Sequence, residues 1–371
     1  MIKRKITQNI QEDWDKKKAL VLTGPRQVGK TTLIEHLTKD KNTLLLNGDN
    51  PQTRLQLAEA SLNFLLNLVS DYDVVVIDEA QRIENIGLTT KMLVDAKLDK
   101  QFILTGSSAL DLSNKINEPL TGRKWEHQLY PLCWEEIRNH YTFAKAYERL
   151  EEFLIYGMYP EVVTQSKKQK ILLQLSSSYL YKDILELTSI KKPDILMKLL
   201  NALALQVGSE VSYNELSNIL GVDRLTIINY IDLLEKVYVI FRLYPYATNQ
   251  RNEITSKPKI FFYDNGIRNA VIGQFGPLQS RQDSGILFEN FFISERIKKL
   301  DYEGFYGKIH YWRNTRQAEI DFLEILENEI SAYEIKFSPR TKVRFTKSFT
   351  EKYNPKNTFA INSTNFWEHL Q

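Results

Sequence analysis

The sequence predicts an α/β protein whose N-terminal part is built on a parallel sheet. Short apolar runs at residues 19–23, 43–46, 73–78 and 101–105 alternate with stretches of helical periodicity. Strands that alternate with helices pair in parallel, because each helix returns the chain to the edge where the previous strand began. A chain of 371 residues also exceeds what one hydrophobic core usually serves. We therefore expect three domains, at residues 1–140, 141–275 and 276–371.

The composition is that of an ordinary globular protein. Hydrophobic residues make up 43% of the sequence and charged residues 26%, and the formal net charge is +3. This charge is too small to indicate nucleic-acid binding unless the basic residues gather in one place. No run approaches the roughly 18 apolar residues of a membrane span. The single cysteine, Cys133, excludes an internal disulfide and fits a reducing compartment, so we expect a cytoplasmic protein with no membrane contact.

The first apolar run leads into a phosphate-binding loop. Gly24, Gly29, Lys30 and Thr31 match the spacing G-x-x-x-x-G-K-[ST] between a strand and a helix, which is the context this motif requires. Glycines let the backbone N–H groups wrap a triphosphate, Lys30 supplies a charge to the β- and γ-phosphates, and Thr31 supplies a hydroxyl to Mg²⁺. The expected ATP-binding residues are Gly24, Pro25, Arg26, Gln27, Val28, Gly29, Lys30, Thr31 and Thr32.

The apolar run at residues 73–78 leads into two adjacent acids, Asp78 and Glu79. We expect this strand to lie beside the strand that carries the loop, so that both carboxylates meet the nucleotide at the carboxyl edge of the sheet. Asp78 would then hold Mg²⁺, and Glu79 would orient or polarise the attacking water. The alternative is a solvated helix N-terminus, where the dipole favours acidic residues in any case.

Two further features concern the same edge of the sheet. The strand at residues 101–105 ends in a run of small hydroxyl residues, and one of Thr105, Ser107 or Ser108 could sense the γ-phosphate or cap the next helix. Arg123 follows a glycine turn and is our first candidate for an arginine finger, with Arg26 as a second. A surface salt bridge is the alternative role for Arg123.

Residues 212–241 predict a winged helix-turn-helix. A first helix ends at Gly221, a second spans about residues 224–236, and a strand follows. Arg224, Thr226 and Asn229 would lie on the side of the second helix that contacts DNA in such domains. The same helix region carries Asp223, Asp232 and Glu235, so packing against a protein remains the alternative.

The C-terminal part combines acidic residues with one lysine in a fixed order. Glu289 lies in a predicted helix, Asp321 in one strand, and Glu334 and Lys336 two residues apart in the next. Alternate strand residues share a face, so these side chains could converge. The three acids would bind Mg²⁺ while Lys336 stabilises the phosphate or assists the nucleophilic water, as in metal-dependent phosphodiester hydrolysis. The alternative is the polar face of half-solvated strands.

Together, these motifs resemble one family of prokaryotic AAA-type ATPases. The resemblance rests on residues 24–32, Ile77-Asp-Glu-Ala-Gln81, Leu104-Thr-Gly-Ser-Ser108, Leu120-Thr-Gly-Arg123, Glu289, Glu319-Ile-Asp-Phe322 and Glu334-Ile-Lys336. The family carries a C-terminal domain of unknown function with a PD-(D/E)xK-like core. The resemblance implies an AAA-type P-loop module, a winged-helix segment and a restriction-endonuclease-like domain, with Lys30, Thr31, Asp78 and Glu79 in the nucleotide site. These ATPases keep an arginine after a glycine, and Arg123 matches that position. The resemblance leaves open whether this arginine acts within the chain or across a subunit boundary.

The resulting expectation is an ATP-hydrolysing protein that uses Mg²⁺ and engages double-stranded DNA through its C-terminal domains. Two alternatives remain open. One is a Mg²⁺-dependent nuclease gated by ATP. The other is a nucleotide-dependent adaptor that binds a protein partner, in either case with possible assembly into a homo-oligomer.

Overall fold

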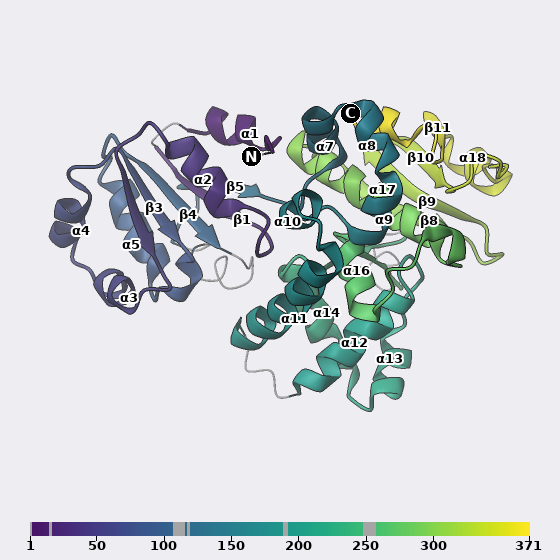
Figure 1. Ribbon diagram of the computed structural model, residues 1–371, viewed down its shortest axis with the longest axis horizontal. Helices are drawn as coiled ribbons and strands as arrows, with labels where there is room; N and C mark the ends of the chain where they lie inside the picture. The colour runs from purple at the N-terminus through teal and green to yellow at the C-terminus, as the bar shows by residue number, and fades with distance from the viewer. Residues whose placement is uncertain (1, 15–16, 107–115, 117–118, 188–191, 248–256) are drawn as a thin grey trace. The chain divides into compact units, whose positions relative to one another are not determined.

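The computed structural model describes residues 2–14, 17–106, 116, 119–187, 192–247 and 257–371, with residues 178–187 described by their helical backbone alone. These residues form two compact units, coloured from purple to yellow along the chain in Figure 1. The first comprises Met1–Leu132 and Lys236–Tyr238, and the second comprises Cys133–Glu235 and Val239–Gln371. Each unit is described by itself.

The first unit is a five-stranded parallel sheet flanked by helices (Figure 1). Its strands, in sheet order, are β2 (Thr43–Asn47), β3 (Val74–Asp78), β4 (Gln101–Gly106), β1 (Ala19–Thr23) and β5 (Lys124–Gln128). The helices are α1 (Thr7–Glu12), α2 (Lys30–Thr38), α3 (Pro51–Ala58), α4 (Leu62–Val69), the 3₁₀ turn η1 (Ala80–Arg82) and α5 (Ile86–Asp95). Every strand pair is parallel, which confirms the predicted α/β class.

The three central strands are buried, as their unbroken apolar runs predict. Residues 74–77 of β3 are all buried, and so are all six residues of β4. A strand covered by helices on both faces has no solvent side, so its apolar residues need not alternate with polar ones. These strands and the helices beside them form one core that includes Val21, Val75, Ile77 and Leu104.

The order of the strands corrects one prediction. The acid-bearing strand β3 does not lie beside the loop-bearing strand β1, because β4 pairs with both and separates them. Helical crossovers allow consecutive strands to be placed apart, so chain order does not fix sheet order. The edge strand β5 was not expected from the sequence.

The second unit begins with helices and ends with a mixed sheet. Its helices are α7 (Trp134–Tyr141), α8 (Phe143–Glu148), α9 (Leu150–Tyr156), α10 (Pro160–Thr164), α11 (Lys168–Leu187), α12 (Pro193–Leu205), α13 (Tyr213–Leu220), α14 (Arg224–Lys236), α16 (Asn265–Ile272), η2 (Leu278–Ser280), α17 (Ser284–Tyr302), α18 (Lys347–Tyr353) and η3 (Phe366–His369). The strands β6 (Ile240–Leu243) and β7 (Lys259–Phe262) pair antiparallel after α13 and α14. Helix α14 spans the residues expected for the second helix of the helix-turn-helix.

Local sequence explains the turn between α13 and α14. The Ser212 hydroxyl accepts a hydrogen bond from the backbone N–H of Glu215 and so caps the start of α13. Gly221 ends the helix with φ +64°, a left-handed conformation that glycine adopts without a Cβ penalty. The Asp223 carboxylate then accepts a hydrogen bond from the N–H of Thr226 in the first turn of α14.

The C-terminal sheet has the order β11–β10–β9–β8. Its strands are β8 (Lys308–Arg313), β9 (Glu319–Leu326), β10 (Glu329–Ile335) and β11 (Asn357–Ile361). Strands β8, β9 and β10 are antiparallel neighbours, whereas β11 runs parallel to β10. One face packs on α18 through a small core that includes Trp312, Leu323, Ala332 and Phe349.

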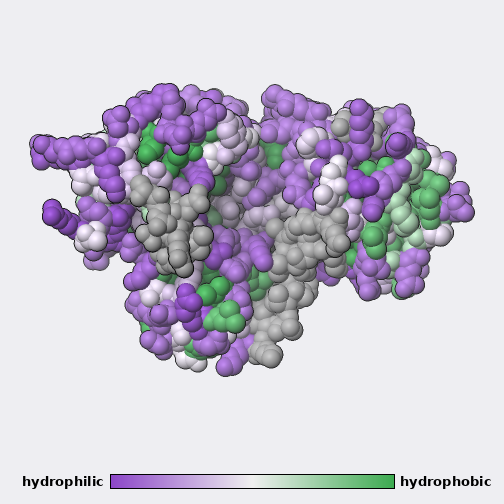
Figure 2. Space-filling view, turned by 180° about the vertical axis from the view of Figure 1, so that it is seen from behind, coloured by the Kyte–Doolittle hydropathy of each residue, from purple (hydrophilic) through white to green (hydrophobic). Residues whose placement is uncertain are grey.

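No helix among the described residues is long and apolar enough to cross a membrane. Hydrophilic residues, purple in Figure 2, cover most of the face shown there, with smaller hydrophobic areas between them.

Candidate functional site

The loop between β1 and α2 has the backbone of a phosphate cradle. Gly24 adopts φ +150°, and a Cβ atom at this position would lie 2.1 Å from the carbonyl oxygen of Leu129, so only glycine fits. Gly29 adopts φ +93° directly before the first turn of α2. Such turns let successive backbone N–H groups converge on an anion, and the helix N-terminus adds its positive dipole end.

The remaining loop residues differ in exposure. In chain order, Pro25 is buried, Arg26 half-buried, Gln27 exposed and Val28 buried, while Thr31 and Thr32 are exposed in the first turn of α2. The exposed threonines lie where a nucleotide would meet the helix.

The Lys30 ammonium lies against the loop. Its side chain is buried, and Nζ donates hydrogen bonds of 2.8 Å to the Gly24 carbonyl and 2.9 Å to the Pro25 carbonyl. The ammonium therefore sits within the turn that the loop makes. This places a positive charge at the position where the motif requires one for the β- and γ-phosphates.

The Asp78 carboxylate joins three elements at the carboxyl edge of the sheet. The Thr31 hydroxyl of α2 donates a hydrogen bond of 3.3 Å to Oδ2 of Asp78. The Thr105 hydroxyl of β4 donates to Oδ1, and the backbone N–H of Glu79 donates to the same oxygen over 3.1 Å. Strand β4 lies between β1 and β3, so Thr105 contacts Asp78 from the neighbouring strand.

Glu79 has a left-handed backbone and a held side chain. Its φ is +48°, which is uncommon for a residue other than glycine and redirects the chain after β3. The Gln81 amide donates a hydrogen bond of 2.5 Å to Oε2 of Glu79. On the other side, a Cβ atom on Gly48 would lie 2.3 Å from the Glu79 carbonyl oxygen, so the backbone here is closely packed.

One important residue of this site was not evident from the sequence. Arg4 is buried, and its guanidinium donates hydrogen bonds of 2.6 Å to the Val28 carbonyl and 2.5 Å to the Tyr130 carbonyl. It therefore ties the phosphate loop to the segment that follows β5. Val28 and Tyr130 lie 24 and 126 residues from Arg4 in the chain, so these contacts leave no local pattern in the sequence.

The structure does not bring Arg123 to the nucleotide edge. Arg123 precedes β5, and its carbonyl accepts a hydrogen bond from the N–H of Ala19 at the start of β1. The loop follows the far end of β1, so a strand of five residues, roughly 16 Å at 3.3 Å per residue, separates the two. Arg123 instead forms an exposed ion pair of 2.6 Å with Asp95, the alternative role noted above. An arginine finger acting within this chain has no support from this position.

Arg26 lies in the loop itself and remains the candidate cation on that side. The other two residues considered at the end of β4, Ser107 and Ser108, lie outside the described residues.

The residues present fit a nucleotide with Mg²⁺. A hydroxyl and a carboxylate in mutual contact, Thr31 and Asp78, are the oxygen donors that Mg²⁺ prefers, and the ammonium of Lys30 lies in the adjacent loop. The site thus combines anion-binding backbone, a cation and a metal-binding pair at one edge of the sheet.

A second group of charged residues lies in the C-terminal sheet. Lys336 Nζ lies 3.0 Å from Oδ2 of Asp321 and 3.3 Å from Oε2 of Glu334. The N–H of Ile335 also donates a hydrogen bond of 2.7 Å to Asp321. Register pairs Tyr333 with Phe322, so Asp321 and Glu334 come from directly opposed positions of β9 and β10. The structure therefore brings these three predicted residues together.

Glu289, the fourth predicted residue, meets a lysine that the sequence did not single out. Lys259 of β7 is 3% exposed, and its Nζ lies 3.6 Å from Oε1 of Glu289 and forms an ion pair with Glu319 of β9. We call Glu289, Glu319, Asp321, Glu334, Lys259 and Lys336 the carboxylate cluster. Lys259 could not be recognised from sequence because it lies 30 residues before Glu289 in a different predicted domain.

Burial and charge repulsion raise the pKa of two acids of the carboxylate cluster, Glu289 and Glu334. Burial, with a further contribution from Asp321, raises the pKa of Glu289 to about 7, although Lys259 opposes the rise. Burial and the charge of Asp321 likewise raise the pKa of Glu334 to about 8. Acidic neighbours raise the pKa of Lys336 above its ordinary value, although burial alone would lower it. The charged forms of Glu289 and Glu334 are therefore disfavoured here, and a bound cation would favour those forms.

The carboxylates are not arranged as a complete metal shell. Within the part of the chain that the structure describes, no three His, Cys, Asp or Glu side chains are grouped so that they could hold a metal ion. The ammonium groups of Lys259 and Lys336 lie among the carboxylates instead. Oxygen donors suited to Mg²⁺ are present, but each is paired with a lysine.

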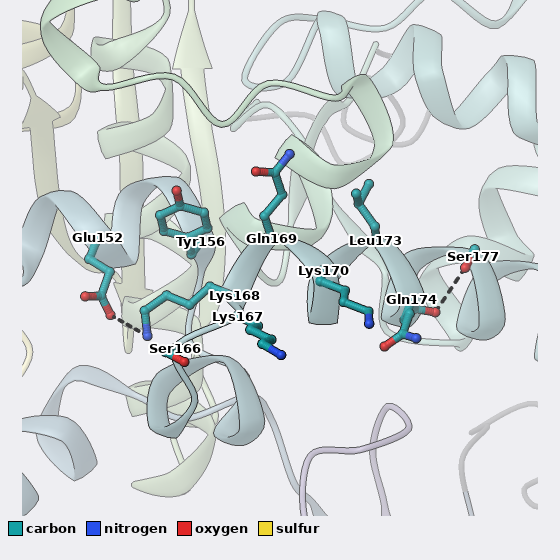
Figure 3. Close-up of a pocket in the computed structure, with 10 residues that line it drawn as sticks. All are labelled: Glu152, Tyr156, Ser166, Lys167, Lys168, Gln169, Lys170, Leu173, Gln174 and Ser177. Carbon is teal, nitrogen blue, oxygen red and sulfur yellow. Dashed lines mark hydrogen bonds and ion pairs between the residues drawn. The ribbon is translucent and has the colours of Figure 1, made fainter.

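A basic groove lies on the helices of the second unit. It has a volume of about 890 Å³ and is lined by Glu152, Tyr156, Ser166, Lys167, Lys168, Gln169, Lys170, Leu173, Gln174 and Ser177. Figure 3 shows Lys168 joined to Glu152, while Lys167, Lys170 and Gln174 extend from the start of α11. The ammonium groups of Lys167 and Lys170 have no hydrogen-bond or ion-pair partner among the described residues.

The first comparison concerns protein families. Residues 16–138 match the AAA domain family. Residues 147–278 match the domain of unknown function DUF8612, and residues 284–369 match the domain of unknown function DUF4143. Fold and match therefore support an AAA-type P-loop domain, followed by two regions that match domains of unknown function.

Relatives over most of the chain are uncharacterised. A protein of Haemophilus influenzae is 28% identical over 340 residues, covering 85% of this chain and 82% of its own length. A protein of Mycobacterium tuberculosis is 28% identical over 323 residues, covering 85% of this chain and 70% of its own. Among solved structures, the Walker-type ATPase of Pyrococcus abyssi covers 73% of this chain and 96% of its own, with a TM-score of 0.51 and 14% identity. That likeness is one of fold.

Proposed function

We propose that the protein binds and hydrolyses ATP at the edge of the parallel sheet and couples turnover to DNA. The observation that carries the ATPase part is the junction at Asp78. This residue contacts the Thr31 hydroxyl on the helix that begins with Lys30, and it immediately precedes Glu79. One short segment of chain thus supplies the metal-binding acid and a second acid beside it.

Each residue then has a role set by its position. Backbone N–H groups of the loop and Lys30 bind the phosphates, and the pair of Thr31 and Asp78 holds the cation. Mg²⁺ held by Thr31 and Asp78 would offset the charge on the phosphates. Glu79 accepts a hydrogen bond from water at the γ-phosphate and orients it for attack, while Gln81 fixes the carboxylate.

Steady-state ATP hydrolysis tests this proposal. We expect wild type to turn over ATP, Lys30→Ala to lose binding and turnover, and Glu79→Gln to bind ATP without turnover. Binding is measured separately with a fluorescent ATP analogue, so that loss of affinity and loss of chemistry are told apart. Full activity of Glu79→Gln would remove Glu79 from the mechanism.

The DNA part of the proposal rests on two surfaces of the second unit. In the first, α13, α14 and the strands β6 and β7 have the order of a winged helix. The acids that argued against DNA contact are engaged internally, because Arg242 of β6 pairs with Asp232 at 2.7 Å and with Glu235. Asp223 caps α14. Arg224 and Asn229 of this helix are exposed.

The second surface is the basic groove. Lys167 immediately precedes α11 and Lys170 lies in its first turn, where the N-terminal N–H groups of a helix also attract anions (Figure 3). Phosphate oxygens are contacted by such lysines without regard to sequence, and this contact is salt-dependent. Tyr156 lines the same groove and offers a ring that can pack on a sugar or base.

DNA binding is tested with the double variant Lys167→Gln/Lys170→Gln. We expect weaker binding to a duplex, a smaller dependence of affinity on salt, and loss of any stimulation of ATP hydrolysis by DNA. The control is Lys145→Gln/Lys347→Gln, which removes the same charge from two exposed lysines outside the groove. ATP turnover that is indifferent to DNA in wild type would instead favour the nucleotide-dependent adaptor.

A second candidate function is Mg²⁺-dependent phosphodiester hydrolysis in the C-terminal domain. The convergence of Asp321, Glu334 and Lys336 on adjacent strands favours it, since oxygen donors for a metal and a cation for the phosphate lie at one point. Asp321→Asn and Lys336→Ala should abolish nicking of supercoiled plasmid while leaving ATP turnover intact. Wild type that never nicks DNA with Mg²⁺ or Mn²⁺ excludes this function.

A further inference from the structure

Lys259 occupies an unusual position for a lysine. Its side chain is 3% exposed, and it belongs to β7, which pairs with β6 and not with the C-terminal sheet. Its ammonium nevertheless reaches Glu289 of α17, at 3.6 Å, and Glu319 of β9. A buried ammonium is stable only when opposite charge compensates it, so the position of Lys259 depends on these two acids.

The carboxylate cluster has two halves of the same design. In one half, Lys336 lies between Asp321 and Glu334, at 3.0 Å and 3.3 Å. In the other, Lys259 lies between Glu289 and Glu319. The first lysine follows the strand that carries Glu334, but the second comes from a different part of the fold.

We propose that Lys259 is a built-in counter-ion of the carboxylate cluster, and that a divalent cation bound there competes with its ammonium for Glu289 and Glu319. This inference rests on the second candidate function proposed above, because it assumes that the cluster takes a divalent cation.

Two observations support competition over a purely structural ion pair. First, the contact with Glu289 is an ion pair at 3.6 Å, and Oε1 of Glu289 accepts no hydrogen bond among the described residues, so this oxygen remains available to a cation. Second, Arg313 Nε lies 3.6 Å from Oε2 of Glu319 and leaves that acid compensated when Lys259 withdraws.

The arrangement also links two parts of the second unit. Lys259 begins β7, and the preceding chain contacts Tyr311 of β8, whose hydroxyl donates a hydrogen bond of 2.7 Å to the Lys257 carbonyl. A cation that displaces the Lys259 ammonium therefore changes a contact made by the first residue of β7, the strand that pairs with β6.

The test measures Mn²⁺ binding by titration calorimetry and thermal unfolding with EDTA or Mn²⁺, without nucleotide. Every protein carries Asp78→Asn, so that the nucleotide site does not contribute. We expect Lys259→Met to unfold at a lower temperature in EDTA, to bind Mn²⁺ at least tenfold more tightly than the parent, and to regain stability with Mn²⁺. Lys259→Gln should behave in the same way if the methionine variant does not fold.

The matched control is Lys298→Met. Lys298 is also a buried lysine, 1% exposed, and pairs with Glu295 at 2.6 Å on the same helix α17 as Glu289. Its removal should lower the unfolding temperature without changing Mn²⁺ affinity and without recovery by Mn²⁺. Asp321→Asn added to Lys259→Met should remove Mn²⁺ binding, which locates the ion at the carboxylate cluster.

Two failures are distinguishable. Equal Mn²⁺ affinity in the parent and in both Lys259 variants overturns the counter-ion proposal and leaves the cation site standing. No Mn²⁺ binding in the parent or in either Lys259 variant overturns the cation site itself, and the counter-ion proposal with it.

Discussion

The Thr31 hydroxyl donates a hydrogen bond of 3.3 Å to the Asp78 carboxylate, across 47 residues of chain. The first residue lies in the helix after the phosphate loop and the second at the end of β3. Strand β4 lies between β1 and β3, and its Thr105 donates a hydrogen bond to the other oxygen of Asp78. The contact is therefore assembled from the ends of two strands, β3 and β4, and the start of one helix, α2.

Removing the Thr31 hydroxyl should weaken the cation site. We expect Thr31→Ala to lower the apparent affinity for Mg²⁺ in ATP hydrolysis by about 10- to 100-fold, since one ligand and one support of Asp78 are lost together. The measurement is the Mg²⁺ dependence of turnover at saturating ATP. Thr31→Ser keeps the hydroxyl and should retain most activity, and equal activity of both variants would exclude this role.

Gln81 should act on the rate and not on binding. Its amide holds Oε2 of Glu79 at 2.5 Å, so Gln81→Ala frees the carboxylate to rotate. We expect kcat to fall by roughly tenfold, equivalent to about 1.4 kcal/mol, with little change in KM for ATP. Steady-state kinetics resolve the two parameters. A rise in KM at constant kcat would place Gln81 in nucleotide binding instead.

Arg4 should stabilise the phosphate loop. Arg4→Ala leaves the buried carbonyls of Val28 and Tyr130 without their guanidinium donors, so we expect a loss of roughly 1–3 kcal/mol in the free energy of unfolding of the first unit. KM for ATP should rise with it. Lys3→Ala alters an exposed neighbour and serves as the control, and Arg4→Lys should recover part of the loss because one ammonium cannot span both carbonyls as the guanidinium fork does.

Alanine variants at two glycines, Gly122 and Gly24, distinguish the cost of backbone strain from the cost of a steric clash. Gly122 has φ +74° and no atom within 4 Å of an added Cβ, so Gly122→Ala should cost only about 1–2 kcal/mol. Gly24→Ala adds a clash at 2.1 Å with the Leu129 carbonyl, and we expect loss of ATP binding as the loop is displaced. Chemical denaturation and nucleotide binding of both variants provide the comparison. Normal ATP binding by Gly24→Ala would contradict the close approach.

Acid should destabilise the second unit through Asp283. Burial alone would raise its pKa, but hydrogen bonds from Arg281 and Arg268 lower the pKa of Asp283 to about 2. The carboxylate therefore contributes its full stability above its unfolded pKa of 3.8 and loses it as pH falls towards 2. We expect about 1 kcal/mol after allowance for solvent screening. Urea unfolding from pH 6 to pH 2 should show a smaller slope in Asp283→Asn over the acidic part of this range.

The sequence predicted those structural features that neighbouring residues encode. The phosphate loop needs glycines, a lysine and a threonine at fixed spacing because one turn of backbone must wrap one group. The pair Glu334 and Lys336 is also local, since alternate residues of a strand share a face. The helix expected over about residues 224–236 was placed correctly, because Gly221 ends the helix before it and Asp223 accepts a hydrogen bond from its first turn.

Prediction failed where partners are distant in the chain. The expectation that β1 and β3 are neighbours was wrong because β4, the later strand, is inserted between them. Arg123 follows a suggestive Thr-Gly pair, yet its carbonyl bonds to the start of β1, at the edge opposite the loop. Neither Arg4 nor Lys259 belongs to a local motif, because a buried cation is defined by whatever carboxylates or carbonyls the fold brings to it.

The sequence by itself determines three local patterns. These are a glycine-rich loop typical of phosphate binding, two acids after a buried strand, and an acid and a lysine two residues apart near the C-terminus. These follow from short-range geometry, which is the same in any strand, turn or helix. The fold alone establishes which of those groups meet, that Thr105 completes the contact of Thr31 with Asp78, and that Lys259 enters the carboxylate cluster. The reason is physical: strand order and burial arise from packing of the whole unit, and long-range contacts are paired by that packing.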